Sequence, residues 1–332
     1  MNKLTKLGVS ALCGSLAGIS AANAGELSVS GGVDMSWISL EDATTGNPIG
    51  VGSNFGLAGS GELDNGWGVA LSIAYTNKAN YSSTNVTVTV PSMGDLIITQ
   101  GGTGTGIDRM DDVTPTVWEE AYASGLSTGI NTVNGASGGA GFEFTPNMLP
   151  DGLTGRIAYT PDINGSSNND KVNSGGTSGG SAYDVTLVAT DAITGMSGLT
   201  IGAGYGKTKS VTAVADLKDE TYYATYAVGG FTLGYQMSEA DLGTTSNEQK
   251  YENDGYGITF NVNDDLSVGY NHYESKQTST TNVTAEASSF QVAYSAGGAS
   301  VRIMRATADN MDYSTAVSQD RDNTVVSVAL AF

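Results

Sequence analysis

The 332-residue chain carries 34 acidic and 14 basic side chains, a net charge of −20 at pH 7, and 39% of its residues are hydrophobic. So negative a chain would repel nucleic acid, which excludes that class of partner. The single cysteine, Cys13, lies in a segment that we expect to be removed, so the mature chain has no disulfide and no cysteine-based metal site.

An export signal is predicted at residues 1–24. A basic start is followed by an apolar stretch over 7–19, and Ala22-Asn23-Ala24 offers small residues for cleavage. Residues 25–332 would then form one mature domain. The stretch over 7–19 is too short to span a membrane as a helix, and no later stretch holds eighteen uncharged apolar residues, which excludes helical membrane insertion.

Apolar residues alternate with small or polar ones along the whole mature chain. In one example, Trp67, Val69, Leu71, Ile73 and Tyr75 alternate with glycine, alanine and serine. A period of two predicts strands with one apolar face and one small or polar face. The pattern predicts sixteen strands, near 26–39, 50–62, 67–79, 82–90, 95–101, 139–146, 152–160, 181–190, 197–208, 217–228, 230–240, 251–262, 266–276, 283–295, 299–309 and 322–332.

The connections between these strands are expected to alternate strictly between short and long. Short ones such as 64–66, 91–94 and 263–265 contain the Gly, Asn and Asp residues of tight hairpins. Long ones lie near 40–49, 80–81, 102–138, 161–180, 209–216, 241–250, 277–282 and 310–321. Short periplasmic turns, long extracellular loops and an even strand count are typical of a transmembrane antiparallel β-barrel. A soluble β-sandwich also alternates but seldom has this rhythm of loops.

The last strand ends on an aromatic residue. Val326, Val328, Leu330 and Phe332 share one face, and a terminal ring of this kind fits the aqueous boundary of a bilayer better than a soluble core. We therefore predict an all-β protein of about sixteen strands in the outer membrane of a Gram-negative bacterium.

The order of several segments resembles the general trimeric porins of Gram-negative outer membranes. Residues 53–75 look like the family's second hairpin, residues 94–101 look like the strand before its constriction loop, and Phe332 matches its terminal aromatic. The resemblance implies a homotrimer and a third long loop that folds into the lumen, with acidic residues facing a basic cluster on the wall. It also implies that Phe332 is part of the signal read by the barrel insertion machinery.

Carried over to this chain, the resemblance makes residues 102–138 the constriction loop. Its charged candidates for an electrostatic filter at the narrowest point are Asp108, Arg109, Asp111, Asp112, Glu119 and Glu120. The alternative is a solvated acidic loop like others in this acidic chain.

The parity of the strands selects the wall residues that should line the pore. The inward-facing candidates are Asp34, Lys78, Glu143, Arg156, Asp184, Gln236, Asn271 and Arg302. Arg305 has the lipid-facing parity and should lie near a strand end, at a bulge or at a subunit contact. Asn54 stands where the family often has an arginine, so the basic cluster is thin and the lumen should be net negative.

His272, the only histidine, has outward parity after Leu266, Val268 and Tyr270. It is expected to be an interfacial residue, although a hydrolase could use it if a carboxylate oriented its ring. Acidic segments at 162–165, 168–170 and 309–312, with Asp320 and Asp322, offer oxygen ligands for Ca²⁺ and for bridges to lipopolysaccharide. They lack the spacing of a twelve-residue calcium loop, so solvated loops are the alternative.

The sequence thus predicts a non-catalytic, water-filled diffusion pore for small hydrophilic solutes and ions, with a moderate cation preference. A substrate-specific porin, a barrel hydrolase around His272 and an outer-membrane adhesin are the alternatives that the residues leave open.

Overall fold

A computed structural model describes residues 27–41, 46–77, 80–100, 104–136, 139–163, 179–210, 215–243, 249–278 and 282–331. The predicted export signal, Lys78, the acidic segment 168–170 and the terminal Phe332 lie outside these residues. None of the described helices has the length and apolar character needed to cross a membrane.

Sixteen antiparallel strands form one closed barrel, in which each strand pairs with its neighbours in sequence and β1 pairs with β16. No predicted boundary differs from the observed one by more than three residues. The strands are β1 Ser28–Glu41, β2 Ile49–Glu62, β3 Gly68–Thr76, β4 Asn80–Val90, β5 Gly94–Gln100, β6 Gly141–Pro146, β7 Leu153–Thr160, β8 Ala182–Ala189, β9 Leu199–Thr208, β10 Leu217–Val228, β11 Phe231–Asp241, β12 Lys250–Asn261, β13 Leu266–Thr278, β14 Thr284–Ala296, β15 Ala299–Asp309 and β16 Arg321–Ala331.

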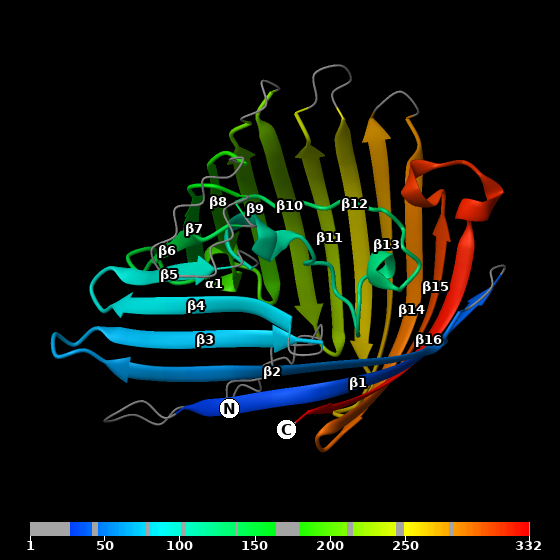
Figure 1. Ribbon diagram of the computed structural model, residues 1–332, viewed down its shortest axis with the longest axis horizontal. Helices are drawn as coiled ribbons and strands as arrows, with labels where there is room; N and C mark the ends of the chain where they lie inside the picture. Colours follow the sequence, from blue (N-terminus) through cyan, green and yellow to red (C-terminus); the bar gives the residue numbers. More distant parts are fainter. Residues whose placement is uncertain are drawn as a thin grey trace.

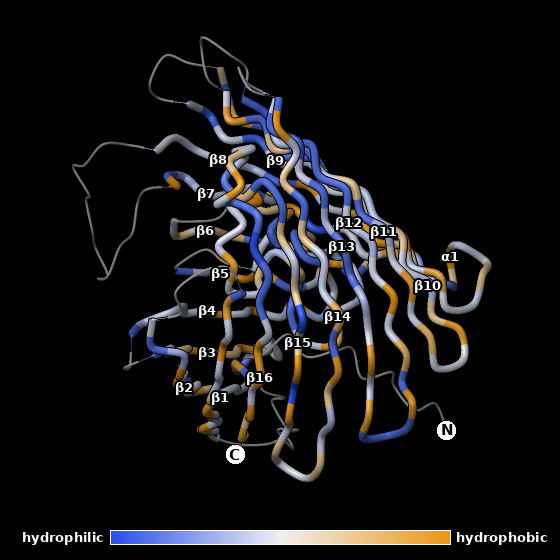
Figure 2. The backbone as a smooth tube through the Cα atoms, turned by 90° about the vertical axis from the view of Figure 1, so that its right-hand side faces the viewer, coloured by the Kyte–Doolittle hydropathy of each residue, from blue (hydrophilic) through white to orange (hydrophobic). Residues whose placement is uncertain are grey.

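Closure of the ring satisfies the backbone of every strand. β16 pairs with β15 on one side and β1 on the other, with Val326 opposite Trp37 and Ala331 opposite Gly32 (Figure 1). A barrel without a free edge leaves no row of unpaired backbone groups in lipid. Hydrophobic and hydrophilic residues alternate along the strands in Figure 2, and the exposed large side chains on the outside include Leu233, Ile258 and Ile303.

The connections do not follow the predicted rhythm strictly. The link between β3 and β4 spans only 77–79, although it belongs to the long-loop end, and the β8–β9 link at the other end holds a single helical turn, α1 Asp191–Thr194. The first link is about as short as the alternation predicts, because β3 ends at Thr76 and β4 begins at Asn80, three and two residues before their predicted boundaries. The start of β1 and the end of β16 both lie at the short-turn end of the barrel. Ser28 pairs with Ala58 near the end of β2, and Ala331 pairs with Gly32 near the start of β1.

The outer surface has an apolar band with a charged belt beyond it. On β13 the outward residues run Leu266, Val268 and Tyr270, then His272, Glu274 and Lys276. Ion pairs lie along this belt: Arg305 with Glu41 and Asp322, Lys276 with Glu252, and Lys250 with Glu239. Tyr256 and Tyr270, with ring centroids 6.4 Å apart, mark the boundary between band and belt, as aromatic residues do at a membrane interface.

The segment between β5 and β6 runs inside the ring of strands. It contains two short 3-10 helices, η1 Gly106–Met110 and η2 Ala121–Ala123, seen in teal beside β9 and β13 in Figure 1. Its Trp118 and Leu126 form an apolar cluster with Met304 and Val325, against which inward Ile38 packs. Two further 3-10 turns, η3 Met311–Tyr313 and η4 Val317–Gln319, lie between β15 and β16.

Candidate pore constriction

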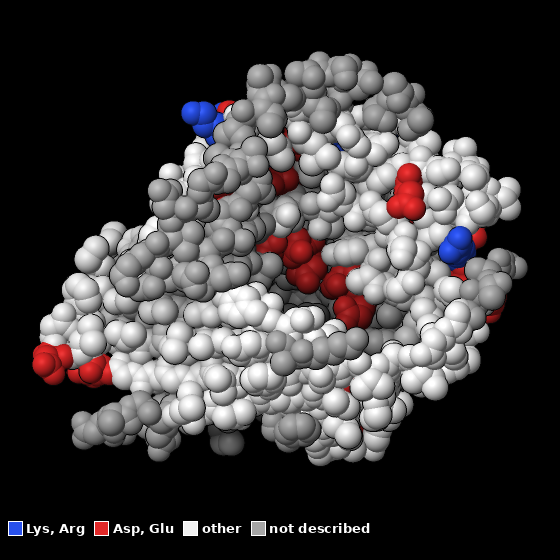
Figure 3. Space-filling model, in the orientation of Figure 1, with Lys and Arg blue, Asp and Glu red and all other residues white. Residues whose placement is uncertain are grey.

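The acidic side chains predicted for the constriction lie on the segment inside the barrel. We call its described residues, 104–136, the inner loop. Figure 3 shows acidic side chains gathered around the central hollow of the molecule. Asp112 is exposed there, Asp108, Asp111 and Glu119 are half-buried, and Glu120 is buried. The structure therefore places these five acids on one loop within the lumen, with unequal access to water.

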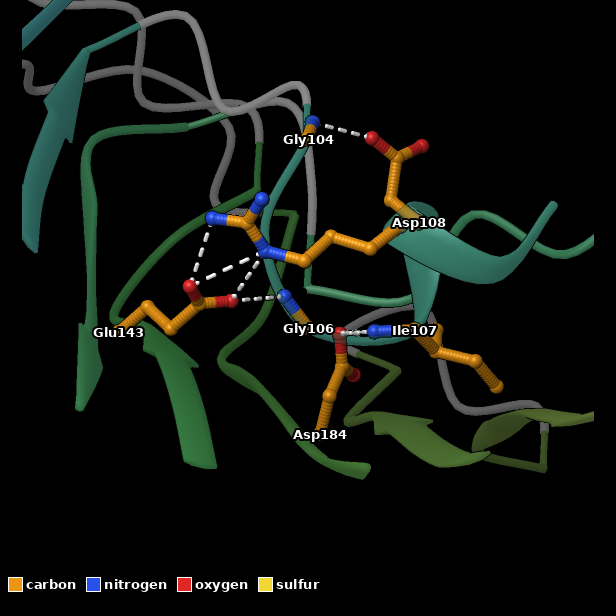
Figure 4. Close-up of polar contacts among 7 residues, drawn as sticks. Gly104, Gly106, Ile107, Asp108, Glu143 and Asp184 are labelled. Atoms are coloured by element: carbon orange, nitrogen blue, oxygen red, sulfur yellow. Dashed lines mark hydrogen bonds and ion pairs between the residues drawn. The ribbon is translucent and has the colours of Figure 1, made fainter. Parts of the chain in front are cut away.

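The first attachment of the inner loop is to Glu143 on β6. The Glu143 carboxylate accepts a hydrogen bond from the Gly106 N–H at 2.6 Å and pairs with the Arg109 guanidinium, whose Nη2 lies 2.7 Å from Oε1 (Figure 4). Asp108 accepts a bond from the Gly104 N–H in the same turn. Charge-assisted bonds of this kind are about twice as strong as neutral ones. They fix the start of η1 against the wall.

Asp184 on β8 holds both ends of the inner loop. Its carboxylate accepts from the Ile107 N–H at 3.1 Å and from the Ala136 N–H at 2.8 Å. Asp219 on β10 accepts from the Gly135 N–H at 2.7 Å. The loop connects the paired strands β5 and β6, and Asp184 binds both of its ends while Asp219 binds only the second.

These contacts correct one part of the predicted pore lining. Glu143 and Asp184 have the inward parity, yet each is 0% exposed because the inner loop lies over them. A carboxylate buried under backbone N–H groups is a structural partner of the loop and does not meet a solute in the lumen.

Farther along, inward amide side chains bind the backbone of the inner loop. We call them the amide row. Gln236 donates to the Met110 carbonyl at 2.5 Å, Gln291 accepts from the Trp118 N–H at 2.8 Å, and Asn323 donates to the Ser124 carbonyl at 2.7 Å. The amide row comprises Gln236, Asn253, Asn271, Gln291 and Asn323, on β11, β12, β13, β14 and β16. A backbone segment buried in a barrel needs such partners for its polar groups.

Inward glycines give the inner loop room to approach the wall. A Cβ added at Gly257 would lie 2.3 Å from the Pro115 carbonyl oxygen, and one at Gly234 would lie 2.3 Å from Pro115 Cδ. Contacts this short do not occur between real atoms, so only glycine fits while the loop stays in place. The wall of β11 and β12 is therefore shaped to receive the middle of the loop.

The protonation of the loop acids follows from their crowding. Burial, together with the nearby Asp112 and Asp108 carboxylates, raises the pKa of Asp111 to about 8. Burial, assisted by Asp112, raises the pKa of Glu120 to about 8. Burial raises the pKa of Glu119 to about 6, against the opposing effect of Arg302. Burial also raises the pKa of Asp112. Near neutral pH the loop therefore carries a partial negative charge that grows with pH.

The basic residues predicted for the lumen are mostly neutralised. Arg302 pairs with Asp34 and Ser327, and its guanidinium carbon lies 4.7 Å from the ring centroid of Trp118 on the inner loop. Arg109 is paired with Glu143, as described above. Arg156 and Arg109 line a cavity of about 330 Å³ together with Tyr223 and Met110. Among the described residues, Arg109 and Arg156 thus lie together on the wall beside η1.

No basic residue is described on the strands opposite the inner loop, where the resemblance implies a basic cluster. As described, β2, β3 and β4 contain no lysine or arginine, and Lys78 lies outside the described residues. Apart from Glu62 at the end of β2, their inward positions are small or neutral: Asn54, Ala58, Ser60, Ala70, Ser72, Ala74, Asn85 and Thr87. The described part of this wall therefore offers no basic partner to the acidic loop.

Arg305 and His272, the two residues predicted to face outward, both lie on the outer face of the barrel. Arg305 lies toward the long-loop end of β15, where it pairs with Glu41 and Asp322. His272 lies outward beyond Tyr270, with Nδ1 2.7 Å from Ser288 Oγ and Nε2 3.2 Å from Glu274 Oε1.

The described loop residues contain no cluster of three metal-ligating side chains that would support the predicted calcium sites. Asp162 accepts from the Gly179 N–H and Asp320 from the Asn310 N–H. Within the described part of the chain, three metal-ligating side chains converge at His272, Glu274 and Glu286 instead.

Sequence reasoning missed the partners of the inner loop. It placed Gln236 and Asn271 on the inward face without assigning them a contact, and it did not single out Asp219, Gln291 or Asn323. Inward Gln and Asn on neighbouring strands, beside inward glycines, are a signal that could have identified the surface that receives the loop.

Comparisons with known proteins agree with this architecture. A sequence model of the Gram-negative porin family matches residues 8–310. No curated protein matches the chain in sequence. Solved structures that share the fold include OmpF of Salmonella typhi in complex with daunomycin, at 13% identity and a TM-score of 0.67, with 92% of this chain and 97% of that chain covered.

Two further structures resemble this chain over nearly its whole length. An anion-selective porin from Comamonas acidovorans is 13% identical with a TM-score of 0.65, covering 93% of this chain and 100% of its own. OmpT of Vibrio cholerae is 14% identical with a TM-score of 0.66, and the match covers 95% of this chain and 100% of the OmpT chain. At this identity the structures support the fold, and the sequence match supplies the family. The chain belongs to the Gram-negative porin family and is an outer-membrane β-barrel channel.

Proposed function

We propose that the chain forms a water-filled pore for passive diffusion of small hydrophilic solutes, with a moderate preference for cations. The observation that carries the proposal is the inner loop, which places Asp111, Asp112, Glu119 and Glu120 inside a barrel whose strands β2–β4, as described, contain no lysine or arginine. Fixed charges at a narrow point between low-dielectric walls act strongly on permeating ions. Cations are attracted there, and anions meet little compensating positive charge.

The anion-selective porin from Comamonas acidovorans shares this fold, so architecture alone does not set the sign of selectivity. In this chain two arginines near the loop are engaged, Arg302 by Asp34 and Arg109 by Glu143, while Arg156 lines the cavity beside Met110. The proposal therefore rests on the charges of this chain and not on its relatives.

Planar bilayers test the proposal directly. We expect ohmic single channels and, under a KCl gradient, a reversal potential displaced toward the equilibrium potential of K⁺. The displacement should shrink as salt rises, because the Debye length falls from about 10 Å at 0.1 M to about 3 Å at 1 M. A protein that inserts without conductance would contradict the pore, and a displacement toward the Cl⁻ potential would contradict the selectivity.

Selectivity should depend on pH. A carboxyl group whose pKa is raised is neutral below that pKa and gains its charge as pH rises through it. With Glu119 at about 6 and Asp111 and Glu120 at about 8, the K⁺ over Cl⁻ permeability ratio should increase from pH 5 to pH 9, by about twofold or more. Reversal potentials measured across this range check it. A ratio that stays constant would show that these groups do not titrate at the constriction.

A homotrimer is proposed as the assembled state. OmpT of Vibrio cholerae, folded in vitro and solved in a trimer form, shares the fold at 13% identity with a TM-score of 0.63. Conductance steps in groups of three and an unheated gel band of about three chain masses would support the trimer. A single-chain mass in mild detergent would oppose it.

A further inference from the structure

Three metal-ligating side chains converge on the outer face of the barrel, away from the lumen. One ligand atom each from His272, Glu274 and Glu286 lies within 4.8 Å of the others. His272 and Glu274 are two residues apart on β13, so they share a face, and Glu286 is on the neighbouring strand β14. The cluster lies just beyond the Tyr256 and Tyr270 rings, at the start of the charged belt.

The two carboxylates occupy an unfavourable place unless a cation lies between them. Glu274 and Glu286 are register partners across β13 and β14. Like charges directly opposite each other on one face of an antiparallel pair are destabilising. The lysine of this region, Lys276, pairs with Glu252 on the other neighbouring strand at 3.4 Å, so it is engaged away from Glu286.

The histidine ring is held so that one nitrogen faces the carboxylates. Ser288 is the register partner of His272, and its Oγ lies 2.7 Å from Nδ1, while the Tyr256 ring lies at a centroid distance of 5.0 Å. Nε2 then points to Glu274 Oε1 at 3.2 Å. When Nδ1 carries the proton and donates a hydrogen bond to Ser288 Oγ, the Nε2 lone pair faces a lone pair of the Glu274 carboxylate. A metal ion at this point turns that repulsion into shared coordination, with Ser288 fixing the tautomer.

We propose that His272, Glu274 and Glu286 form a binding site for a divalent transition metal of the Zn²⁺ class, with a fourth position open to the outside of the barrel. One imidazole and two carboxylates are a ligand set that Zn²⁺ accepts, with an open position where three ligands come from protein. Ligand bonds of about 2.0–2.2 Å place tetrahedral ligand atoms about 3.4 Å apart. The Glu274 side chain is 52% exposed and has room to close the remaining distance. The imidazole favours Zn²⁺ over Ca²⁺ or Mg²⁺.

A serine hydrolase does not explain the cluster as well. Ser288, His272 and Glu274 form a hydrogen-bonded chain, but a hydrolase also needs N–H donors for the developing oxyanion. Ser288 lies within β14, which pairs with β13 on one side and β15 on the other, so the nearby backbone N–H groups are committed to the sheet. Glu286 would also place a negative charge beside that oxyanion, whereas a metal site uses Glu286.

Isothermal titration of the untagged, refolded protein in detergent with ZnCl₂ tests the site. His272 is the only histidine of the chain, so no other imidazole contributes. We expect one Zn²⁺ per chain with a dissociation constant that excess Ca²⁺ does not change. His272→Ala and Glu286→Gln should each weaken binding by at least about tenfold, and Ser288→Ala, which removes only the group that orients the ring, by about 10- to 100-fold.

Glu239→Gln is the matched control, because it removes one outer-face carboxylate of the same charged belt without removing a proposed ligand or releasing Lys276 from Glu252. It should leave the Zn²⁺ affinity unchanged. Equal binding by His272→Ala and the unmodified protein, or equal loss in Glu239→Gln and Glu286→Gln, would overturn the site in favour of diffuse attraction to the acidic belt. Unchanged single-channel conductance in each variant verifies that the barrel has folded, and Zn²⁺ binding does not depend on the selectivity of the pore.

Discussion

Replacing Asp184 by Ala is expected to loosen the inner loop and widen the pore. Asp184 accepts hydrogen bonds from Ile107 near the start of the loop and from Ala136 near its end. Truncation leaves these buried N–H groups without their acceptor, at a cost of about 1–3 kcal/mol each. Single-channel recordings should show larger open-channel noise and a higher mean conductance, and larger neutral polymers should enter the pore.

Asp95→Ala provides the control for this experiment. Asp95 is also an inward-facing wall carboxylate, but it lies on β5 between Thr89 and Thr145 of the neighbouring strands. Its removal takes away one inward carboxyl group, as Asp184→Ala does, without releasing the loop. If both variants gave the same noise and polymer exclusion limit, the effect of Asp184 would come from charge alone and the proposed role in holding the loop would be wrong.

The barrel could be predicted from the sequence because a period of two is a local property. Each strand has to place apolar residues toward lipid at every second position, as Leu233, Tyr235 and Met237 do on β11. The boundaries were least exact around the β3–β4 link, where the alternation placed the end of β3 at 79 and the start of β4 at 82, and the structure places them at Thr76 and Asn80. Polar Asn80, Ser82 and Thr84 give little contrast between the two faces.

What covers an inward residue could not be predicted from parity. Glu143 and Asp184 were placed on the correct face, but their burial depends on the path of a loop that begins far away in the sequence. The role of the amide row could not be predicted for the same reason. Its amides bind backbone groups of Met110, Trp118 and Ser124, and only the path of the inner loop brings those groups to the wall. The raised pKa of Glu120 likewise comes from the crowding of the loop against the wall.

The two pairs of loop acids should control selectivity at different pH values. Asp111 and Glu120, with pKa values of about 8, are only about one-tenth ionised at pH 7. Asp111→Asn with Glu120→Gln should therefore change the reversal potential little at pH 7 and substantially at pH 9. Glu119, with a pKa of about 6, is mostly ionised at pH 7, so Glu119→Gln with Asp112→Asn should reduce cation preference at both pH values.

The variant with all four substitutions should lose most of the cation preference at any pH. Salt screens charges that are farther apart than the Debye length, which is about 8 Å at physiological salt. Acids in the other loops therefore cannot replace the four carboxyl groups that are removed. Each double variant is the matched control of the other, since both remove two carboxyl groups from one loop and differ in which groups are ionised at pH 7. If the two double variants respond identically at pH 7 and pH 9, the assigned protonation states are wrong. If the fourfold variant keeps the full preference, the selectivity arises elsewhere in the pore, because a constriction that sets it must respond to the loss of its own charges.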